Sequence, residues 1–243
     1  MYTTQIGRPE VIKDSYLRYF FILNKEIKFD SKSLSSLRSL YDSSDRHYHN
    51  NEHINQCLFH LNDFFLNNNT RQFLKLTSSD KKRLWRIVYV SILYHDIVYN
   101  PYDRFNELNS AELFLSDGIK WLNSDDTTAV YNTILMTARH LHEFSDSELK
   151  LYEALMLDID LAGFADGLRN DDLTIRQEFK HIDDYTYYSN RRNFLQCLIN
   201  KRRIYYTDFF KTKYEESARQ NIINKIYHCD EMIAGLKNEH SNK

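Results

Sequence analysis

Histidine and aspartate side chains at four separate places in this chain could together bind a divalent metal ion. In chain order they are His49 with His53, the pair His95-Asp96, then His140, and finally Asp158 with Asp160. Neutral imidazole and carboxylate groups are both common ligands of first-row transition metals. Because each group lies in or beside an apolar segment, something must compensate its polarity when that segment is buried. The ordered set therefore indicates a metal site.

The first two histidines lie four residues apart in the segment RHYHNNEH, residues 46–53. On a helix this spacing places His49 and His53 on the same face, which Cys57 and His60 continue. One histidine could bind a metal ion while the other carries protons. The alternative is a polar and aromatic stripe that packs against a neighbouring helix.

His95 and Asp96 follow the most apolar segment of the chain, residues 87–94, which is too short to cross a membrane. We expect both residues in the last turns of a buried helix, because Pro101 comes shortly after them. Adjacent side chains on a regular helix diverge by about 100°, so both can contact one ion only if it lies between them. The alternative is that Asp96 caps the loop that follows.

The late carboxylates Asp158 and Asp160 lie in the apolar segment EALMLDIDLAGF, and His140 follows the apolar run AVYNTILMTA. Carboxylates among leucine and isoleucine side chains need a compensating partner. At a spacing of two residues on a helix they point apart, so we expect only one of them in the site. The other would orient a ligand or cap a helix.

The composition predicts that helices position these groups. The 243 residues include 5 glycines and 2 prolines, where roughly 17 and 12 are ordinary for this length, and sheet-rich folds need both for their turns. The fold class is therefore expected to be all-α. Apolar periodicity and candidate caps, among them Pro9 in a first turn and the regions 30–31 and 78–80, predict helices near 9–24, 31–42, 50–67, 79–98, 106–123, 126–142, 147–164, 171–185, 190–202 and 206–237.

We expect one domain over residues 1–243, with a metal-bearing core at about 35–165 and a C-terminal helical extension at about 170–237. The net charge of −2 argues against a general polyanion binder. Three widely spaced cysteines without a CxxC pair indicate buried, reduced thiols in a cytoplasmic protein. Neither a secretory signal nor a membrane-spanning segment is expected.

The order of these blocks resembles the HD superfamily of metal-dependent phosphohydrolases, and more closely a family of uncharacterised HD-domain proteins of similar length. The matching blocks are RHYHNNEH at 46–53, YHDIVYNP at 94–101, Asn106-Glu107 with Ser110-Ala111, and DIDL at 158–161. A more diffuse match continues to about residue 224, with Asn190 where a glycine is typical. The resemblance implies a helical HD bundle with additional C-terminal helices.

The YHNxxH block also resembles the catalytic signature of class I cyclic-nucleotide phosphodiesterases, although the match does not extend to their purine pocket. This resemblance implies that His49 is the general acid. It also implies a divalent ion held by His53, His95, Asp96 and Asp160.

The remaining residues of the blocks have further implied roles. His140 and Asp158 would border a second metal ion or the phosphate, Arg46 would offset phosphate charge, and Glu107 would orient water or a second ion. We expect substrate contacts from Tyr48, Asn50, Arg176 and Arg191.

The expected activity is hydrolysis of a small phosphate ester, such as a nucleotide, by water activated on the metal. Imidazole and carboxylate ligands suit Mn, Fe, Co, Ni and Zn, and Mg less well, with one or two ions per chain. One alternative is an HD-fold binding or sensing module with little or no catalysis. The other is a nucleic-acid-associated protein, suggested by basic residues at 191–192 and 201–203 near two tyrosines. Such runs also occur on solvated helix faces, so nucleic acid is not the expected partner.

Overall fold

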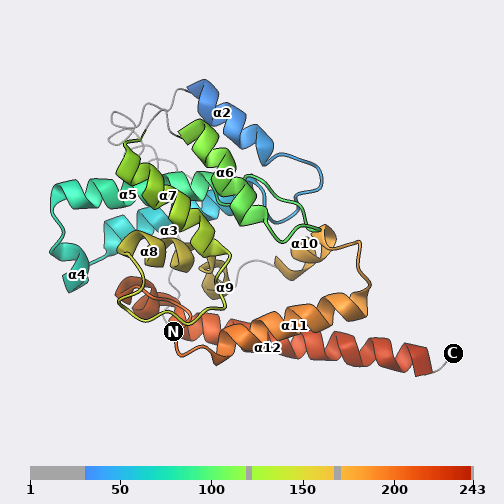
Figure 1. Ribbon diagram of the computed structural model, residues 1–243. Helices are drawn as coiled ribbons and strands as arrows, with labels where there is room; N and C mark the ends of the chain where they lie inside the picture. Colours follow the sequence, from blue (N-terminus) through green and yellow to red (C-terminus); the bar gives the residue numbers. More distant parts are fainter. Residues whose placement is uncertain (1–30, 119–121, 167–170, 242–243) are drawn as a thin grey trace, which may run out of the picture.

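Helices form the regular secondary structure of the described part of the chain, residues 31–118, 122–166 and 171–241 of the computed structural model (Figure 1). No strand occurs in those ranges, so the expected all-α fold is confirmed. The helix expected at 9–24, with Pro9 in its first turn, lies outside the described residues. In chain order the helices are α2 (Ser31–Leu40), α3 (Asn51–Asn67), α4 (Arg71–Leu74), α5 (Ser78–Tyr94), α6 (Asn106–Gly118), α7 (Ser124–Thr137), α8 (Leu151–Asp160), α9 (Gly163–Asp166), α10 (Asp171–Glu178), α11 (Asp184–Asn200) and α12 (Asp208–Ser241).

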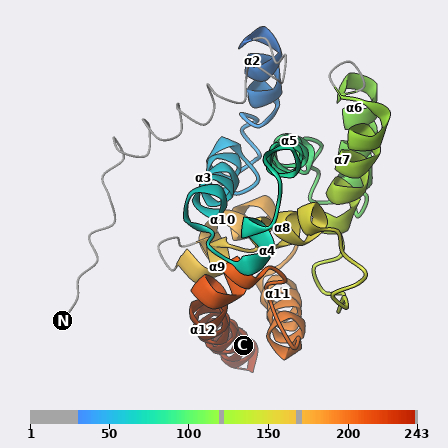
Figure 2. The ribbon, with the colours of Figure 1, turned by 90° about the vertical axis from the view of Figure 1, so that its left-hand side faces the viewer.

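Helix α5 is the central element of the bundle. It contacts α3, α6, α7 and α8, and Figure 2 shows it nearly end-on between α3 and α7. Its first turn is fixed by a capping box, in which Thr77 and Asp80 each accept a hydrogen bond from the other's backbone N–H. Every residue from Ile87 to Tyr94 is buried. A helix apolar on all sides belongs inside a core, and this one carries His95 at its end.

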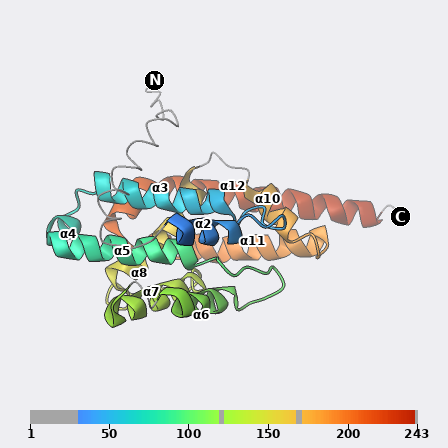
Figure 3. The ribbon, with the colours of Figure 1, turned by 90° about the horizontal axis from the view of Figure 1, so that it is seen from above.

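The C-terminal helices pack against the metal-bearing helices. One contiguous apolar core includes side chains from α2 through α12, and the rings of Phe209 and Phe210 contact that of Phe64 on α3. Helices α11 and α12 lie side by side, and α12 extends beyond the other helices towards the C-terminus (Figures 1 and 3). The predicted C-terminal extension thus shares the core with the metal-bearing helices.

Several helices end earlier than their apolar pattern predicts. Helix α5 ends at Tyr94 rather than near 98, because the Arg46 guanidinium donates hydrogen bonds to the carbonyl oxygens of Asp96 (2.6 Å) and Ile97 (2.7 Å). Helix α7 ends at Thr137 rather than near 142, and the segment expected as one helix at 147–164 divides into α8 and α9. The metal-site residues therefore lie at helix ends, where side chains can leave the regular helical directions.

Two other sequence predictions concern the cysteines and the membrane. All three cysteines are free thiols, but only Cys57 and Cys229 are buried, so the expectation of burial is wrong for the exposed Cys197. Among the described helices, none combines the length and apolarity needed to cross a bilayer.

Candidate metal centre

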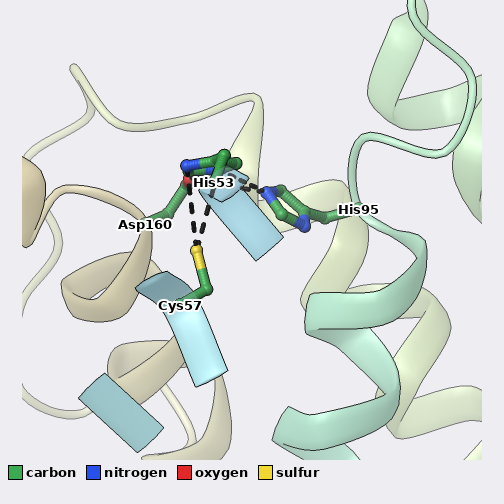
Figure 4. Close-up of side chains that lie close together, drawn as sticks. All are labelled: His53, Cys57, His95 and Asp160. Atoms are coloured by element: carbon green, nitrogen blue, oxygen red, sulfur yellow. Dashed lines mark hydrogen bonds and ion pairs between the residues drawn. The ribbon is translucent and has the colours of Figure 1, made fainter. Parts of the chain in front are cut away.

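Three helices deliver the predicted ligands to one point. His53 lies in the first turn of α3, His95 follows the last residue of α5, and Asp160 is the last residue of α8. Figure 4 shows the side chains of His53, His95 and Asp160 gathered from these separate elements. Asp96, the residue after His95, contributes a second carboxylate. The structure therefore brings together all four side chains that the sequence predicts as ligands.

The distances between the donor atoms fit a bound metal ion. His53 Nε2 lies 3.3 Å from His95 Nε2 and 3.2 Å from Asp160 Oδ1, and the last two atoms are 3.5 Å apart. Asp96 Oδ2 lies 3.1 Å from His95 Nε2 and 3.6 Å from His53 Nε2. Metal–ligand bonds of about 2.0–2.1 Å place neighbouring donors about 2.9–3.4 Å apart in octahedral or tetrahedral sites. The side chains thus need to move by only a few tenths of an ångström to share one ion.

His95 and Asp96 reach the same point because the regular helix has already ended. The Nδ1–H of His95 donates to the Ile92 carbonyl oxygen at 3.0 Å, so the Nε2 atom that faces the other ligands carries the lone pair when the ring is neutral. Asp96 lies in the turn beyond α5. Its side chain therefore does not have to point away from that of His95, as adjacent side chains on a regular helix do. Both groups therefore point towards one centre.

The electrostatics of the cluster favour a cation. Burial alone would lower the pKa of His95, but the charges of Asp96 and Asp160 raise it well above its ordinary value. Burial would likewise raise the pKa of each carboxyl group, but His95 and its neighbouring imidazoles hold both below their usual range. Two carboxylates beside imidazoles in a desolvated position require positive charge. A divalent ion meets that requirement.

Cys57 is a donor near the centre that the sequence analysis did not include among the ligands. One helical turn after His53, its Sγ atom lies 3.7 Å from His53 Nε2. The donor atoms of His53, Cys57, His95 and Asp160 all lie within 4.8 Å of one another. Burial, together with the negative charges of Asp160 and Asp96, raises the pKa of the thiol well above its ordinary value. Its position on the His53 face was predictable from the spacing, whereas its distance to the other ligands was not.

His140 contacts the centre through Asp160. Its Nε2–H donates to Asp160 Oδ2 at 2.8 Å, which leaves Oδ1 directed at His53 and His95. A hydrogen bond of this kind fixes the orientation of a ligating carboxylate. Lys201 in turn donates to the His140 carbonyl oxygen at 2.5 Å. The structure thus places His140 at the border of the site, where the sequence predicts it.

Asp158 does not reach the centre, so the sequence-based suggestion of a second-metal or phosphate role has no geometric support. Its Oδ1 accepts from the Tyr206 N–H at 2.6 Å, and its Oδ2 accepts from the Thr207 N–H at 2.8 Å and hydroxyl at 2.7 Å. The side chain is completely buried. Burial raises its pKa to about 7, although the hydrogen bonds from Tyr206 and Thr207 lower it. It fixes the loop that begins α12, which is the capping role that its spacing from Asp160 allows.

His49 forms a pair with Glu178, a residue that the sequence analysis gave no role. His49 Nδ1 lies 2.6 Å from Glu178 Oε2, and Glu178 also accepts from the backbone N–H groups of Tyr48 and His49 and from the Tyr99 hydroxyl. Burial opposes protonation, but Asp96 and Glu178 raise the pKa of His49 above its ordinary value. The two residues lie 129 positions apart, and no local pattern predicts such a pair.

Two residues of the RHYHNNEH block, residues 46–53, have structural contacts. Asn50 caps α3, since its side-chain oxygen accepts from the N–H groups of Glu52 and His53, while its amide donates to the His47 carbonyl oxygen. Arg46 donates to the carbonyl oxygens of His49, Asp96 and Ile97. The guanidinium therefore holds the two metal-bearing segments together, and its predicted contact with phosphate stays a prediction.

The other predicted residues lie at varying distances from the centre. Tyr48 and Arg191 line a pocket with His49, His140 and Asp160. Burial raises the pKa of Glu107, and the charges of the centre contribute, which places this carboxyl group nearby. Arg176 is not among the side chains that line this pocket, because it pairs with Asp184 and donates to two backbone carbonyl oxygens after α10.

Most side chains of the basic runs at 191–192 and 201–203 form ion pairs or hydrogen bonds within the chain. Arg192 pairs with Asp230 at 2.5 Å, Arg203 pairs with Asp146, and Lys201 binds a backbone carbonyl oxygen. Tyr205, one of the two tyrosines nearby, is completely buried. These contacts do not favour the nucleic-acid-binding alternative, which stays a prediction.

Comparisons with known proteins do not assign the chain to a family. No protein-family model matches it, and neither a curated protein nor a solved structure is significantly similar to it. The resemblance to HD proteins therefore depends on the residues of the blocks and on the geometry that they form.

Proposed function

We propose that this protein is a metal-dependent phosphohydrolase that acts on a small phosphate ester such as a nucleotide. The observation that carries the proposal is the convergence of His53, His95, Asp96 and Asp160 beside a pocket that His49 also lines. The ligand Asp160 and a candidate proton donor thus line the same pocket, and hydrolysis of an ester requires both kinds of group beside the substrate.

The donor set suits a transition-metal ion. Two imidazole nitrogens and two carboxylate oxygens are favourable ligands for Mn, Fe, Co, Ni or Zn, and the neighbouring thiol of Cys57 disfavours Mg further. Four protein ligands leave coordination positions open on an octahedral ion. When bound, a divalent cation supplies Lewis acidity and lowers the pKa of bound water towards neutrality.

We propose His49 as the general acid. Glu178 engages its Nδ1 atom, so Nε2 is the nitrogen that remains for a substrate. The charges of Asp96 and Glu178 raise the pKa of His49 above its ordinary value and so favour the protonated ring. Protonated His49 would donate its Nε2 proton to the leaving oxygen of the ester, a step that contributes about 10²–10⁴-fold when the acid is well placed. Glu178 then stabilises the proton-carrying form and holds the ring in place.

The test is hydrolysis of a panel of nucleotides and aryl phosphates by purified protein supplied with Mn, Co or Zn. Turnover should require metal, and Asp96→Ala should remove both the metal and the activity. His49→Gln should keep the metal and lose most of the rate. Turnover by metal-free protein would contradict the mechanism, whereas retained metal without turnover of any ester would favour the binding-module alternative.

A further inference from the structure

The pocket beside the metal centre has two chemically different ends. Its volume is about 220 Å³, and its lining includes Asp160, His140 and His49 at the metal end. The other walls come from α9, α10, α11, α12 and the residue after α10, which carry the C-terminal side chains Phe164, Ile175, Phe179, Arg191, Phe194 and Lys225. A substrate that places a phosphate at the metal end must therefore present its organic part to these C-terminal side chains.

A surplus positive charge lies among the C-terminal side chains. Asp172 accepts from Arg191 Nη2 at 3.1 Å through Oδ1 and from Lys225 Nζ at 2.6 Å through Oδ2. One carboxylate thus faces two cations, which leaves one positive charge uncompensated within the group. All three side chains are largely withdrawn from water, with exposed fractions of 13%, 17% and 19% for Arg191, Asp172 and Lys225. Attraction to an anion is little screened in such a position.

Arg191 also has a donor without an acceptor. Its Nε atom is buried and has no hydrogen-bond partner among the described residues, although a guanidinium group has five N–H donors. The rings of Phe164 and Phe194 each lie 5.7 Å from its central carbon and cannot accept a conventional hydrogen bond from it. A buried unpaired donor is costly, and an anionic ligand in the pocket would remove that cost.

Aromatic side chains line the pocket together with these charges. Phe164, Phe179 and Phe194 come from α9, the end of α10 and α11. Such walls fit an apolar or planar organic body rather than an extended sugar chain or a polymer.

We propose that the substrate carries two anionic groups, one at each end of a small, flat organic body. The ester phosphate lies at the metal end, and a second phosphate or carboxylate binds Arg191 and Lys225. This inference rests on the proposed phosphohydrolase activity and adds the substrate class to it. In this proposal, side chains of the C-terminal helices determine the substrate specificity.

Matched pairs of substrates test the second anion site. One pair is phenyl phosphate and 4-carboxyphenyl phosphate, and the other is adenosine 5′-phosphate and adenosine 3′,5′-bisphosphate. In at least one pair, kcat/KM of the wild-type protein should be about tenfold or more higher for the member with the second anion, as expected of a charge-assisted contact. The pair that shows the preference identifies the second group as carboxylate or phosphate.

Variants locate the preference on the protein. Arg191→Met should abolish the preference for the member with the second anion, and Lys225→Met should weaken that preference in the same direction. Arg192→Met is the matched control, because Arg192 is the next residue on α11 but pairs with Asp230 and does not line the pocket. Equal preference in Arg191→Met and Arg192→Met, or no preference in the wild-type protein, would overturn the proposal.

Failure of the proposed activity can be separated from failure of the anion site. If the metal-loaded protein hydrolyses none of the probes, the phosphohydrolase proposal fails. Calorimetric binding of the two adenosine nucleotides and of the two aryl phosphates then tests the site alone. Tighter binding of a two-anion member by wild type but not by Arg191→Met supports the site, and identical affinities in the two proteins refute it.

Discussion

Two carboxylates on the same helix, one completely buried and one partly buried, have opposite surroundings. Asp158 and Asp160 are separated by one residue at the end of α8. Both oxygens of Asp158 accept hydrogen bonds from the backbone or hydroxyl donors of Tyr206 and Thr207. Asp160 instead faces imidazole nitrogens of His53, His95 and His140 at 2.8–3.5 Å.

The comparison shows how donor chemistry decides what a buried carboxylate can do. Fixed N–H donors satisfy Asp158 permanently, so it stabilises the fold and has no capacity left for an ion. Imidazole rings can exchange a proton for a metal ion, so the pairing around Asp160 can be replaced by coordination. The same residue type is structural at one position and a candidate ligand at the other.

The largest expected effect comes from removing the ligand. Asp160→Asn should weaken metal binding by more than about a hundredfold, since loss of a ligand costs at least as much as loss of a partner that only orients one. Hydrolysis of phosphate esters should fall to background. Asp158→Asn, the matched control two residues away, should retain stoichiometric metal. Equal loss of metal in the two variants would remove the distinction between the two carboxylates.

Asp158 should matter for stability instead. Asp158→Asn presents an amide donor to N–H groups that need acceptors, which should cost about 2–3 kcal/mol of unfolding free energy in the metal-free protein. Urea denaturation measures this loss. Added metal should still stabilise this variant through linkage, whereas Asp160→Asn should show no such increase. A wild-type unfolding midpoint for Asp158→Asn would contradict the structural role.

Glu178 is a third carboxylate and should affect the pH dependence. Glu178→Gln removes the negative charge that raises the pKa of His49. Because the acid form of His49 is the active one, activity is lost as pH rises through this pKa. The alkaline limb of the kcat/KM profile should therefore move to lower pH. An unchanged profile with a uniformly lower rate would show that Glu178 only positions the ring.

Asn50 should give the smallest effect. Asn50→Ala removes the cap of α3 and should cost about 1 kcal/mol of stability, with KM for a phosphate ester changed by less than about threefold. Asn50→Ser, which can cap, should recover most of the stability. A tenfold increase in KM without loss of stability would instead support the substrate contact that the sequence analysis assigned to Asn50.

Periodicity and composition were sufficient for the helical fold. The apolar face of α3 and the fully apolar end of α5 predict buried helices, because only helices that pack on several sides require such patterns. The positions of His53 and His95 relative to these patterns placed them near helix ends, whereas Asp160 was expected inside a helix at 147–164. The prediction that the ligands meet at one site was based on their order along the chain and on the resemblance to HD proteins.

Most of the features that the sequence did not predict are contacts between residues far apart along the chain. The end of α5 depends on Arg46, which lies 50 residues away from Asp96. Glu178 reaches His49 from the C-terminal third, and Lys225 meets Asp172 across 53 residues. No local spacing encodes such pairs, so the sequence could not predict that the Arg46 guanidinium contacts the backbone at Asp96 and Ile97.

Elemental analysis tests the central claim most directly. Purified wild-type protein, prepared without chelators, is offered Mn, Co or Zn and separated from unbound ions. The convergence of His53, His95, Asp96 and Asp160 predicts at least one tightly held ion per chain in the wild-type protein, and none in Asp160→Asn. Wild-type protein that retains no stoichiometric ion of any kind would contradict the metal centre and the activity proposed for it.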